Sequence, residues 1–303
     1  MSPPPVPTWR VGTAEVDGAQ WPVIAHDGGI TRLATLLGED APAEVRTFIA
    51  EQDRWLPPLE KALADRPRAD MPTEPVWAAP LIPAKLICIG ANYAEHNAEM
   101  LGVVDTAFPY AFLKPPTTTL IGAGRPAPLP THAKEIDYEV ELCVVIGRVA
   151  RAVSRERALE HVFGYAVLND LSARDWVRTP SVLGLDWVMS KGFDASAPMG
   201  PLITPARFVG DPDDLAIRLW VNDQLRQDSR TSQMVFDVAA QIAHLSSVMT
   251  LEPGDLIATG TPSGVGMGAD PPTWLAAGDV VRAEVEGLGT LRTPIVHPSR
   301  EDS

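Results

Sequence analysis

The chain has 303 residues, of which 45% are hydrophobic, so it is long enough for one large domain and one small domain with buried cores. Its formal net charge is −14, from 39 acidic and 25 basic residues, which disfavours attraction to phosphate backbones or anionic lipid. We therefore expect no nucleic-acid partner and no membrane contact. Most of the carboxylates must be solvated surface, so any functional assignment to one of them needs support from its local context.

The two cysteines, Cys88 and Cys143, each lie inside an apolar run and provide neither a disulfide framework nor a Cys-x-x-Cys metal site. We expect both to be buried as small hydrophobic residues. The N-terminus lacks a basic region followed by an apolar stretch, and no later segment approaches the apolar length of a bilayer span. A cytoplasmic location is the resulting expectation.

The first elements in chain order are short strands over residues 8–30, around turns at Asp17-Gly18 and Asp27-Gly28. A helical spacing of apolar residues follows over residues 43–56, and we expect Pro57-Pro58 to interrupt this helix. The polar, proline-containing stretch that comes next resembles a linker ending near residue 78. This pattern predicts a small N-terminal accessory lobe with its linker over residues 1–78.

Strand patterns dominate residues 79–298, which we predict to be the large domain. The one clear helix covers residues 236–249, where apolar side chains share a face. The pattern indicates an α+β, predominantly β architecture around a central barrel or a sandwich, without deciding between the two. The predicted strands are residues 85–90, 138–147, 162–169, 215–222, 255–260 and 279–287.

Two glutamates alternate along one of these strands, YEVELCVVIG. A period of two places Glu139 and Glu141 on one face together with Cys143 and Val145. One reading is a barrel rim or an edge strand with a wet first half. The opposite face is also apolar, however, which favours a strand buried on both sides. Adjacent buried anions repel each other, and a hard cation would neutralise them.

Asp170 lies where the apolar run YAVLN gives way to a predicted short helix. It could instead cap that helix, or pair with Arg174 one turn later. Three carboxylates without a nearby His or Cys cluster would form an all-oxygen site, which favours Mg²⁺, Mn²⁺ or Ca²⁺ over Zn²⁺.

A histidine–glutamate pair, His96 and Glu99, has the i, i+3 spacing that brings side chains together on a helix. A carboxylate beside an imidazole orients it and raises its basicity, as a general base acting on water requires. The alternative is an ordinary surface pair. We expect residues 102–109, which follow, to form a mobile cover.

Two further segments contain candidate ligand contacts. Lys191 lies between predicted elements among small residues, where a lysine can be either solvated or in contact with a ligand. The glycine-rich segment over residues 259–268 matches neither the phosphate-binding loop nor the dinucleotide fingerprint. We interpret it as a tight turn at a ligand wall, where Thr261 offers a hydroxyl and an amide to an anion.

Taken in order, several stretches resemble the fumarylacetoacetate hydrolase family. They are IGANYAEHNAEM, FLKPPTTTLIG, DYEVELCVVIG, GYAVLNDLSARDW, SKGFDASAPMGP and LEPGDLIATGTPSGVG, and they span about residues 84–290. The resemblance implies a mixed β-roll or barrel catalytic domain with a small N-terminal lobe, a homodimer, and bound Mg²⁺ or Mn²⁺. It also assigns roles: metal ligation to Glu139, Glu141 and Asp170; catalysis to His96, Glu99 and Lys191; and substrate binding to Lys114, Arg174 and Thr261.

Members of this family act on 2-oxo acids through one enolate-forming step. The presence of a water-activating pair favours hydrolysis of an acylpyruvate-type 2,4-dioxo acid. The alternatives are a decarboxylase for an oxaloacetate-like acid, an isomerase for a dienoic 2-oxo acid, and a catalytically silent metal-binding or ligand-binding scaffold. One departure concerns specificity: members commonly carry Gln shortly after ARDW, whereas this chain has Val177, which predicts a less polar pocket on that side.

Overall fold

The computed structural model describes residues 8–102, 107–177 and 184–298. The fold mixes helices and strands with more strand than helix, as predicted, and its sheets are not closed into a barrel. Within these ranges, no helix is long and apolar enough to cross a bilayer.

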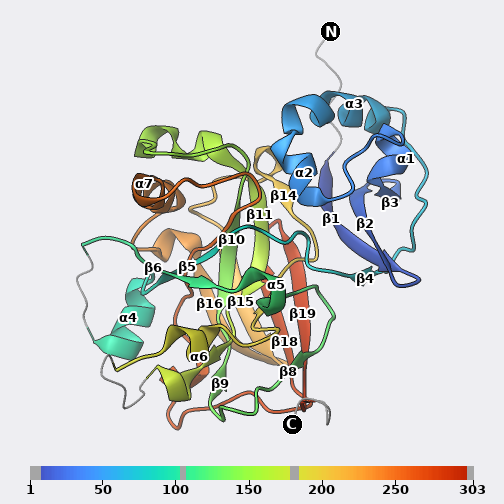
Figure 1. The fold of residues 1–303 in the computed structure, drawn as a ribbon. Coiled ribbons are helices and arrows are strands. Elements are labelled where there is room, and N and C mark those ends of the chain that lie inside the picture. The colour runs from blue at the N-terminus through green and yellow to red at the C-terminus, as the bar shows by residue number, and fades with distance from the viewer. Residues whose placement is uncertain (1–7, 103–106, 178–183, 299–303) are drawn as a thin grey trace.

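A four-stranded antiparallel sheet forms the N-terminal lobe, drawn in blue at the upper right of Figure 1. The predicted turn at Asp17-Gly18 is present, and both residues have positive φ angles of 53° and 76°, as a tight two-residue hairpin turn requires. The strands, in order across the sheet, are β3 (Gly29–Arg32), β2 (Ala19–His26), β1 (Trp9–Val16) and β4 (Val76–Trp77).

The helices of this lobe differ from the prediction at the proline pair. The predicted helix is interrupted at Glu51 rather than at the prolines, and the helix that starts after Glu51 continues through Pro57 and Pro58. Both prolines are exposed, so water can reach the backbone carbonyls that they leave without an intrahelical partner. The buried side chains of Trp55 and Leu59 fix the other face of this helix. The three helices are α1 (Leu33–Leu37), α2 (Val45–Ala50) and α3 (Gln52–Ala64).

A six-stranded mixed sheet forms the centre of the molecule and is buried on both faces. It contains the strand predicted over residues 162–169 with the same bounds, and those predicted over residues 85–90, 138–147 and 255–260 with shorter bounds. In order across the sheet, the strands are β14 (Thr204–Pro205), β11 (Val162–Asn169), β10 (Val140–Ile146), β17 (Leu256–Ala258), β5 (Leu86–Gly90) and β6 (Tyr110–Lys114).

A five-stranded sheet packs against one face of the central sheet, and small strand pairs and helices complete the fold (Figure 1). The five strands are β16 (Gln224–Arg230), β15 (Ala216–Val221), β18 (Val280–Val285), β19 (Gly289–Val296) and β8 (Ala127–Pro128), and the pairs are β12 (Ser172–Ala173) with β9 (Ile136–Asp137) and β13 (Ala197–Pro198) with β7 (Leu120–Ile121). The remaining helices are α4 (Ala94–Leu101), α5 (Pro116–Thr119), α6 (Trp187–Lys191) and α7 (Val238–Val248), with 3-10 turns η1 (Arg155–His161), η2 (Arg174–Trp176), η3 (Ala206–Phe208), η4 (Thr231–Gln233) and η5 (Gly266–Gly268).

The second face of the central sheet packs against the N-terminal lobe. Trp9 and Phe48 of the lobe belong to the same hydrophobic cluster as Cys88 and Cys143 of the central sheet. Both cysteines are buried free thiols, as predicted. The division into a lobe over residues 1–78 and a catalytic domain over residues 79–298 stays a prediction, but the two share one core.

Candidate active site

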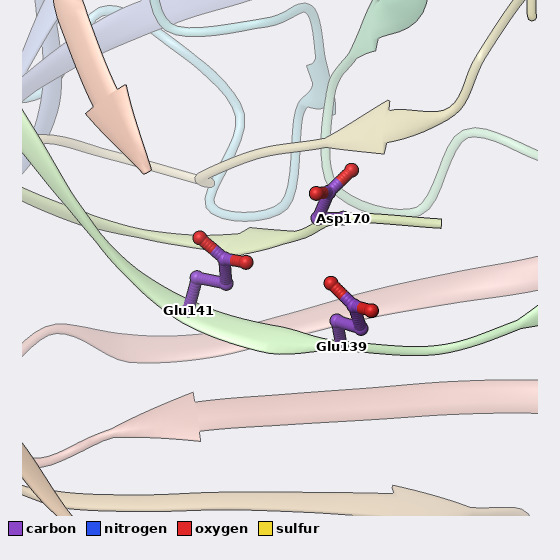
Figure 2. Close-up of side chains that lie close together, drawn as sticks. All are labelled: Glu139, Glu141 and Asp170. Carbon is purple, nitrogen blue, oxygen red and sulfur yellow. The ribbon is translucent and has the colours of Figure 1, made fainter. Parts of the chain in front are cut away.

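Three carboxylates converge at one end of the central sheet, where Glu139 immediately precedes β10, Glu141 lies on it, and the two side chains point to the same side (Figure 2). Asp170 follows β11, the neighbouring strand, and its amide donates to the carbonyl of Glu139 at 2.8 Å. One oxygen from each carboxylate lies within 4.8 Å of the others, and all three residues are buried. This confirms the predicted shared face and places the three side chains together. Neither alternative for Asp170 is present, because Ala173 caps the following turn and Arg174 pairs elsewhere.

Lys191 balances two of these carboxylates. Its Nζ lies 2.7 Å from Glu139 Oε2 and 2.7 Å from Asp170 Oδ2. The sequence placed this lysine between elements, but it is the last residue of α6, and its side chain is only 4% exposed. Burial alone would lower the pKa of Lys191, but the charges of Asp170 and Glu139 outweigh that effect and raise it.

Lys114 lies behind Asp170 at the end of β6. Its Nζ donates to Asp170 Oδ1 at 2.5 Å, to the carbonyl of Ser196 at 2.8 Å and to that of Leu171 at 3.3 Å. The three N–H groups of the ammonium are therefore all engaged within the protein. The predicted substrate contact of Lys114 stays a prediction, whereas its contact with Asp170 is direct.

Arg174 pairs with Glu139 and with an acid that the sequence analysis did not single out. Its Nη2 lies 2.6 Å from Glu139 Oε1, and its Nε donates to Asp137 Oδ2 at 2.9 Å. The signal for Asp137 was present, because D-x-E-x-E extends the alternation of Glu139 and Glu141 by one step. Substrate binding by Arg174 stays a prediction.

The pKa values of Glu139 and Glu141 move in opposite directions. Burial alone would raise the pKa of Glu139, but the positive charges of Lys191 and Arg174 outweigh it and lower the pKa to about 2. The charge of His96 contributes to this shift. Burial and the negative charges of Asp170 and Glu139 raise the pKa of Glu141 well above its usual range.

Glu141 is the observation that tests whether a cation fits this site. It accepts a hydrogen bond from Gly260 N at 2.9 Å, but within the described ranges it forms no ion pair. A buried carboxylate without a counter-charge is costly, and a divalent cation supplies that charge. Two oxygens bound to one Mg²⁺ at about 2.1 Å lie at most about 4.2 Å apart, and two bound to one Ca²⁺ at about 2.4 Å lie at most about 4.8 Å apart. The 4.8 Å limit of this cluster admits Ca²⁺ directly and Mg²⁺ or Mn²⁺ after a small movement of the side chains. The residues therefore fit Mg²⁺ or Mn²⁺, with Ca²⁺ as the alternative.

His96 and Glu99 lie on α4, and their side chains are 12% and 19% exposed. His96 Nδ1 is 3.5 Å from Glu99 Oε2, so the two are neighbours as the i, i+3 spacing predicted, at more than hydrogen-bond distance. Their assignment as a catalytic pair stays a prediction. Of the cover predicted over residues 102–109, residues 103–106 lie outside the described part of the chain.

The glycine-rich segment is a tight turn at the edge of the site, as predicted, with φ angles of 94° at Gly260 and 95° at Gly264. The hydroxyl of Thr261 donates to the carbonyl of Val140 at 2.9 Å and accepts from Gln227 Nε2 at 2.8 Å. Its proton is thus already engaged, which leaves the backbone amide of Thr261 as the donor toward a ligand carboxylate. That contact stays a prediction.

Comparison with known proteins identifies relatives of this fold and site. The family model described as fumarylacetoacetate (FAA) hydrolase C-terminal matches residues 85–296. A mitochondrial oxaloacetate tautomerase from Xenopus laevis is 38% identical over 272 residues, which cover 89% of this chain and 84% of that protein.

Two solved structures are similar along nearly the whole chain. Maleylpyruvate hydrolase from Sphingobium sp. SYK-6, in complex with manganese(II) and pyruvate, has a TM-score of 0.77 at 32% identity and covers 96% of this chain and 100% of its own. The 5-carboxymethyl-2-hydroxymuconate delta-isomerase from Mycobacterium smegmatis has a TM-score of 0.71 at 32% identity, with the same coverage.

Proposed function

Because the chain belongs to the fumarylacetoacetate hydrolase family, we propose that it is a divalent-metal-dependent hydrolase that cleaves a carbon–carbon bond in a small acylpyruvate-type 2,4-dioxo acid. The observation that carries the proposal is a histidine–glutamate pair, His96 and Glu99, 3.5 Å apart on α4, in a protein that also has a buried cluster of three carboxylates. The cluster suits the cation that such chemistry requires, and the pair suits water activation.

Mg²⁺ or Mn²⁺ held by Glu139, Glu141 and Asp170 would supply positive charge opposite the oxygens that become negative as an enolate forms. Lys191 adds the positive charge of its ammonium at the same place, 2.7 Å from two of the three carboxylates. The surrounding strands exclude water from the cluster, since its carboxylates are at most 7% exposed. Exclusion of water lowers the local dielectric constant, which strengthens each interaction between charges.

The proposed reaction uses one water molecule. His96 takes a proton from the water as its oxygen adds to the C4 carbonyl carbon, and Glu99 orients the imidazole. The C3–C4 bond then breaks, and its electron pair moves into the C2–C3 enolate. The C4 fragment leaves as a carboxylic acid, and protonation at C3 gives pyruvate.

Product analysis with a series of acylpyruvates tests the proposal. The wild-type protein with Mn²⁺ is expected to release pyruvate and the carboxylic acid in equal amounts, and a chelator should stop the reaction. His96→Ala should lose about 10²–10⁴-fold in kcat and keep its Mn²⁺ affinity. His161→Ala is the matched control, because His161 lies at the opposite end of β11 from Asp170. Wild-type rates in His96→Ala, or no cleavage of any acylpyruvate, would contradict the proposal.

Keto–enol tautomerisation of oxaloacetate is the second candidate, and the specific observation that favours it is the 38% identical relative. This reaction also forms an enolate but moves a proton between the C2 oxygen and C3 without adding water. Decay of enol-oxaloacetate absorbance without new carbon fragments would indicate tautomerisation. Carbon dioxide with pyruvate would indicate the decarboxylase alternative, and a shifted double bond in a dienoic 2-oxo acid the isomerase. Binding without turnover would indicate the silent scaffold.

We also propose a homodimer, in line with the family resemblance. Light scattering should then give twice the chain mass of 32.6 kDa. A mass of one chain at micromolar concentration would contradict the homodimer. Absence of binding to nucleic acid and to anionic vesicles, and a cytoplasmic location, stay predictions.

A further inference from the structure

The turn over residues 263–268, here called the docking turn, is the surface on which α4 rests. The amide of Gly264 donates to the Glu99 carboxylate and lies 3.2 Å from both of its oxygens. At Gly268 the backbone comes so close that an added Cβ would lie 2.2 Å from Glu99 Cδ. The docking turn therefore fixes where Glu99 lies, and with it His96, one helical turn earlier.

Asp137 fixes the docking turn by accepting hydrogen bonds from two of its backbone amides. This residue is fully buried, and its Oδ1 accepts from the amide of Gly266 at 2.7 Å, while its Oδ2 accepts from the amide of Met267 at 3.1 Å. Arg174 Nε donates to the same Oδ2 at 2.9 Å, and Arg174 Nη2 reaches Glu139 Oε1 at 2.6 Å. A short path of buried, charge-assisted contacts thus runs from the docking turn to a carboxylate of the cluster.

We propose that Asp137 is a positioning residue that ties the docking turn to Glu139 by way of Arg174. This contact fixes the distance between the docking turn and the carboxylate cluster. That distance determines where His96 and Glu99 of α4 lie relative to the reacting atoms. The inference rests on the proposed function, since it assigns catalysis to that pair.

A purely structural role for Asp137 makes different predictions. If Asp137 only neutralised the buried charge of Arg174, its loss would lower stability, Mn²⁺ affinity and turnover together. If it positions α4, then a change confined to the contact between Glu99 and the docking turn should lower turnover alone. Gly268→Ala is such a change, because the new methyl group would displace the Glu99 carboxylate and leave Asp137 and the carboxylate cluster untouched. Gly268 does not have a positive φ, so alanine fits its backbone.

The experiment compares Gly268→Ala with Gly210→Ala, a matched control at a position where an added Cβ meets nothing within 4 Å. Gly268→Ala is expected to lose about 10²-fold in kcat, the usual effect of misplacing a catalytic group by about 1 Å. Its KM and its Mn²⁺ affinity, measured by electron paramagnetic resonance, should stay at wild-type values. Asp137→Asn should show the same split. Wild-type kcat in Gly268→Ala, or parallel loss of kcat and Mn²⁺ affinity, would overturn the inference.

Hydrogen–deuterium exchange of residues 94–101 separates this inference from the proposed function. Faster exchange in Gly268→Ala than in Gly210→Ala is expected, because the contact between Glu99 of α4 and the docking turn is lost. This comparison needs no substrate. An inactive wild-type protein with that difference would refute the proposed function alone, whereas equal exchange in the two variants would refute the positioning role of the docking turn.

Discussion

The Glu141→Gln variant should be at least as stable as the wild-type protein without metal, but less stable than the wild-type protein when metal is bound. In the metal-free protein, Glu141 is a buried carboxylate without an ion pair among the described residues, beside the negative charges of Glu139 and Asp170. Gln keeps the volume and can still accept from the amide of Gly260. It removes a charge whose burial is costly, so metal-free Glu141→Gln should be at least as stable as the wild-type protein.

With metal present, the wild-type protein should be the more stable of the two, because a metal that binds only the folded state stabilises that state. At a metal concentration about 100 times Kd, the wild-type protein gains about 2.7 kcal/mol of unfolding free energy. Loss of one ligand should raise Kd on the order of 100-fold, since even outer contacts contribute about 10–100-fold. The variant then gains only about 0.4 kcal/mol at the same concentration. With an unfolding entropy of about 2.1 cal/mol/K per residue over 303 residues, the difference of about 2.3 kcal/mol corresponds to about 3–4 °C in Tm.

Thermal unfolding with and without Mn²⁺ measures both halves of this prediction. Glu74→Gln is the matched control, because Glu74 is an exposed acid far along the chain from the cluster and should respond to Mn²⁺ as the wild-type protein does. An equal rise in Tm for Glu141→Gln and the wild-type protein would refute metal binding by Glu141. A metal-free variant several degrees less stable than the wild-type protein would refute the argument about the uncompensated charge.

Three further predictions concern specificity, pH and the N-terminal lobe. Val177 follows the 3-10 turn η2 and offers only apolar surface, so the protein should prefer an alkyl acylpyruvate to a dicarboxylic substrate such as oxaloacetate. Val177→Gln should shift the ratio of the two kcat/KM values toward the dicarboxylate, and an unchanged ratio counts against a role of Val177 in specificity. Burial alone would raise the pKa of Asp70, but hydrogen bonds from Thr35 and Arg32 outweigh it and hold the pKa below 3.8. Asp70→Asn should therefore cost about 1 kcal/mol at pH 7. In urea melts the difference should begin to shrink near pH 4 and vanish only once the pH falls below the lowered pKa of Asp70, whereas a pH-independent difference would exclude this ion pair as its cause. Leu59→Ala, in the shared core, should cost about 2–5 kcal/mol in one cooperative transition, and a separate early transition would indicate that the lobe unfolds alone.

The sequence determined the strands and the position of two metal-site candidates on them, because alternation along a strand is a local property. A period of two was enough to place Glu139 and Glu141 on one face, and the apolar opposite face correctly indicated burial. The motif order then added Asp170, whose side chain joins the cluster in the structure. The same local pattern misjudged Pro57-Pro58, since helix packing through Trp55 and Leu59 outweighed their effect on the backbone.

Only the tertiary structure decided which charges meet. Lys191 gave no local sign of burial, and Arg174 had Asp170 as its obvious local partner, yet the pairing of β9 with β12 brings Arg174 to Asp137 instead. The amides that hold Asp137 lie about 130 residues away in sequence, in the docking turn. The periodicity of a segment specifies which face of its own element a side chain occupies. The partner on the facing element depends on strand register and helix packing between distant segments, which no local pattern encodes.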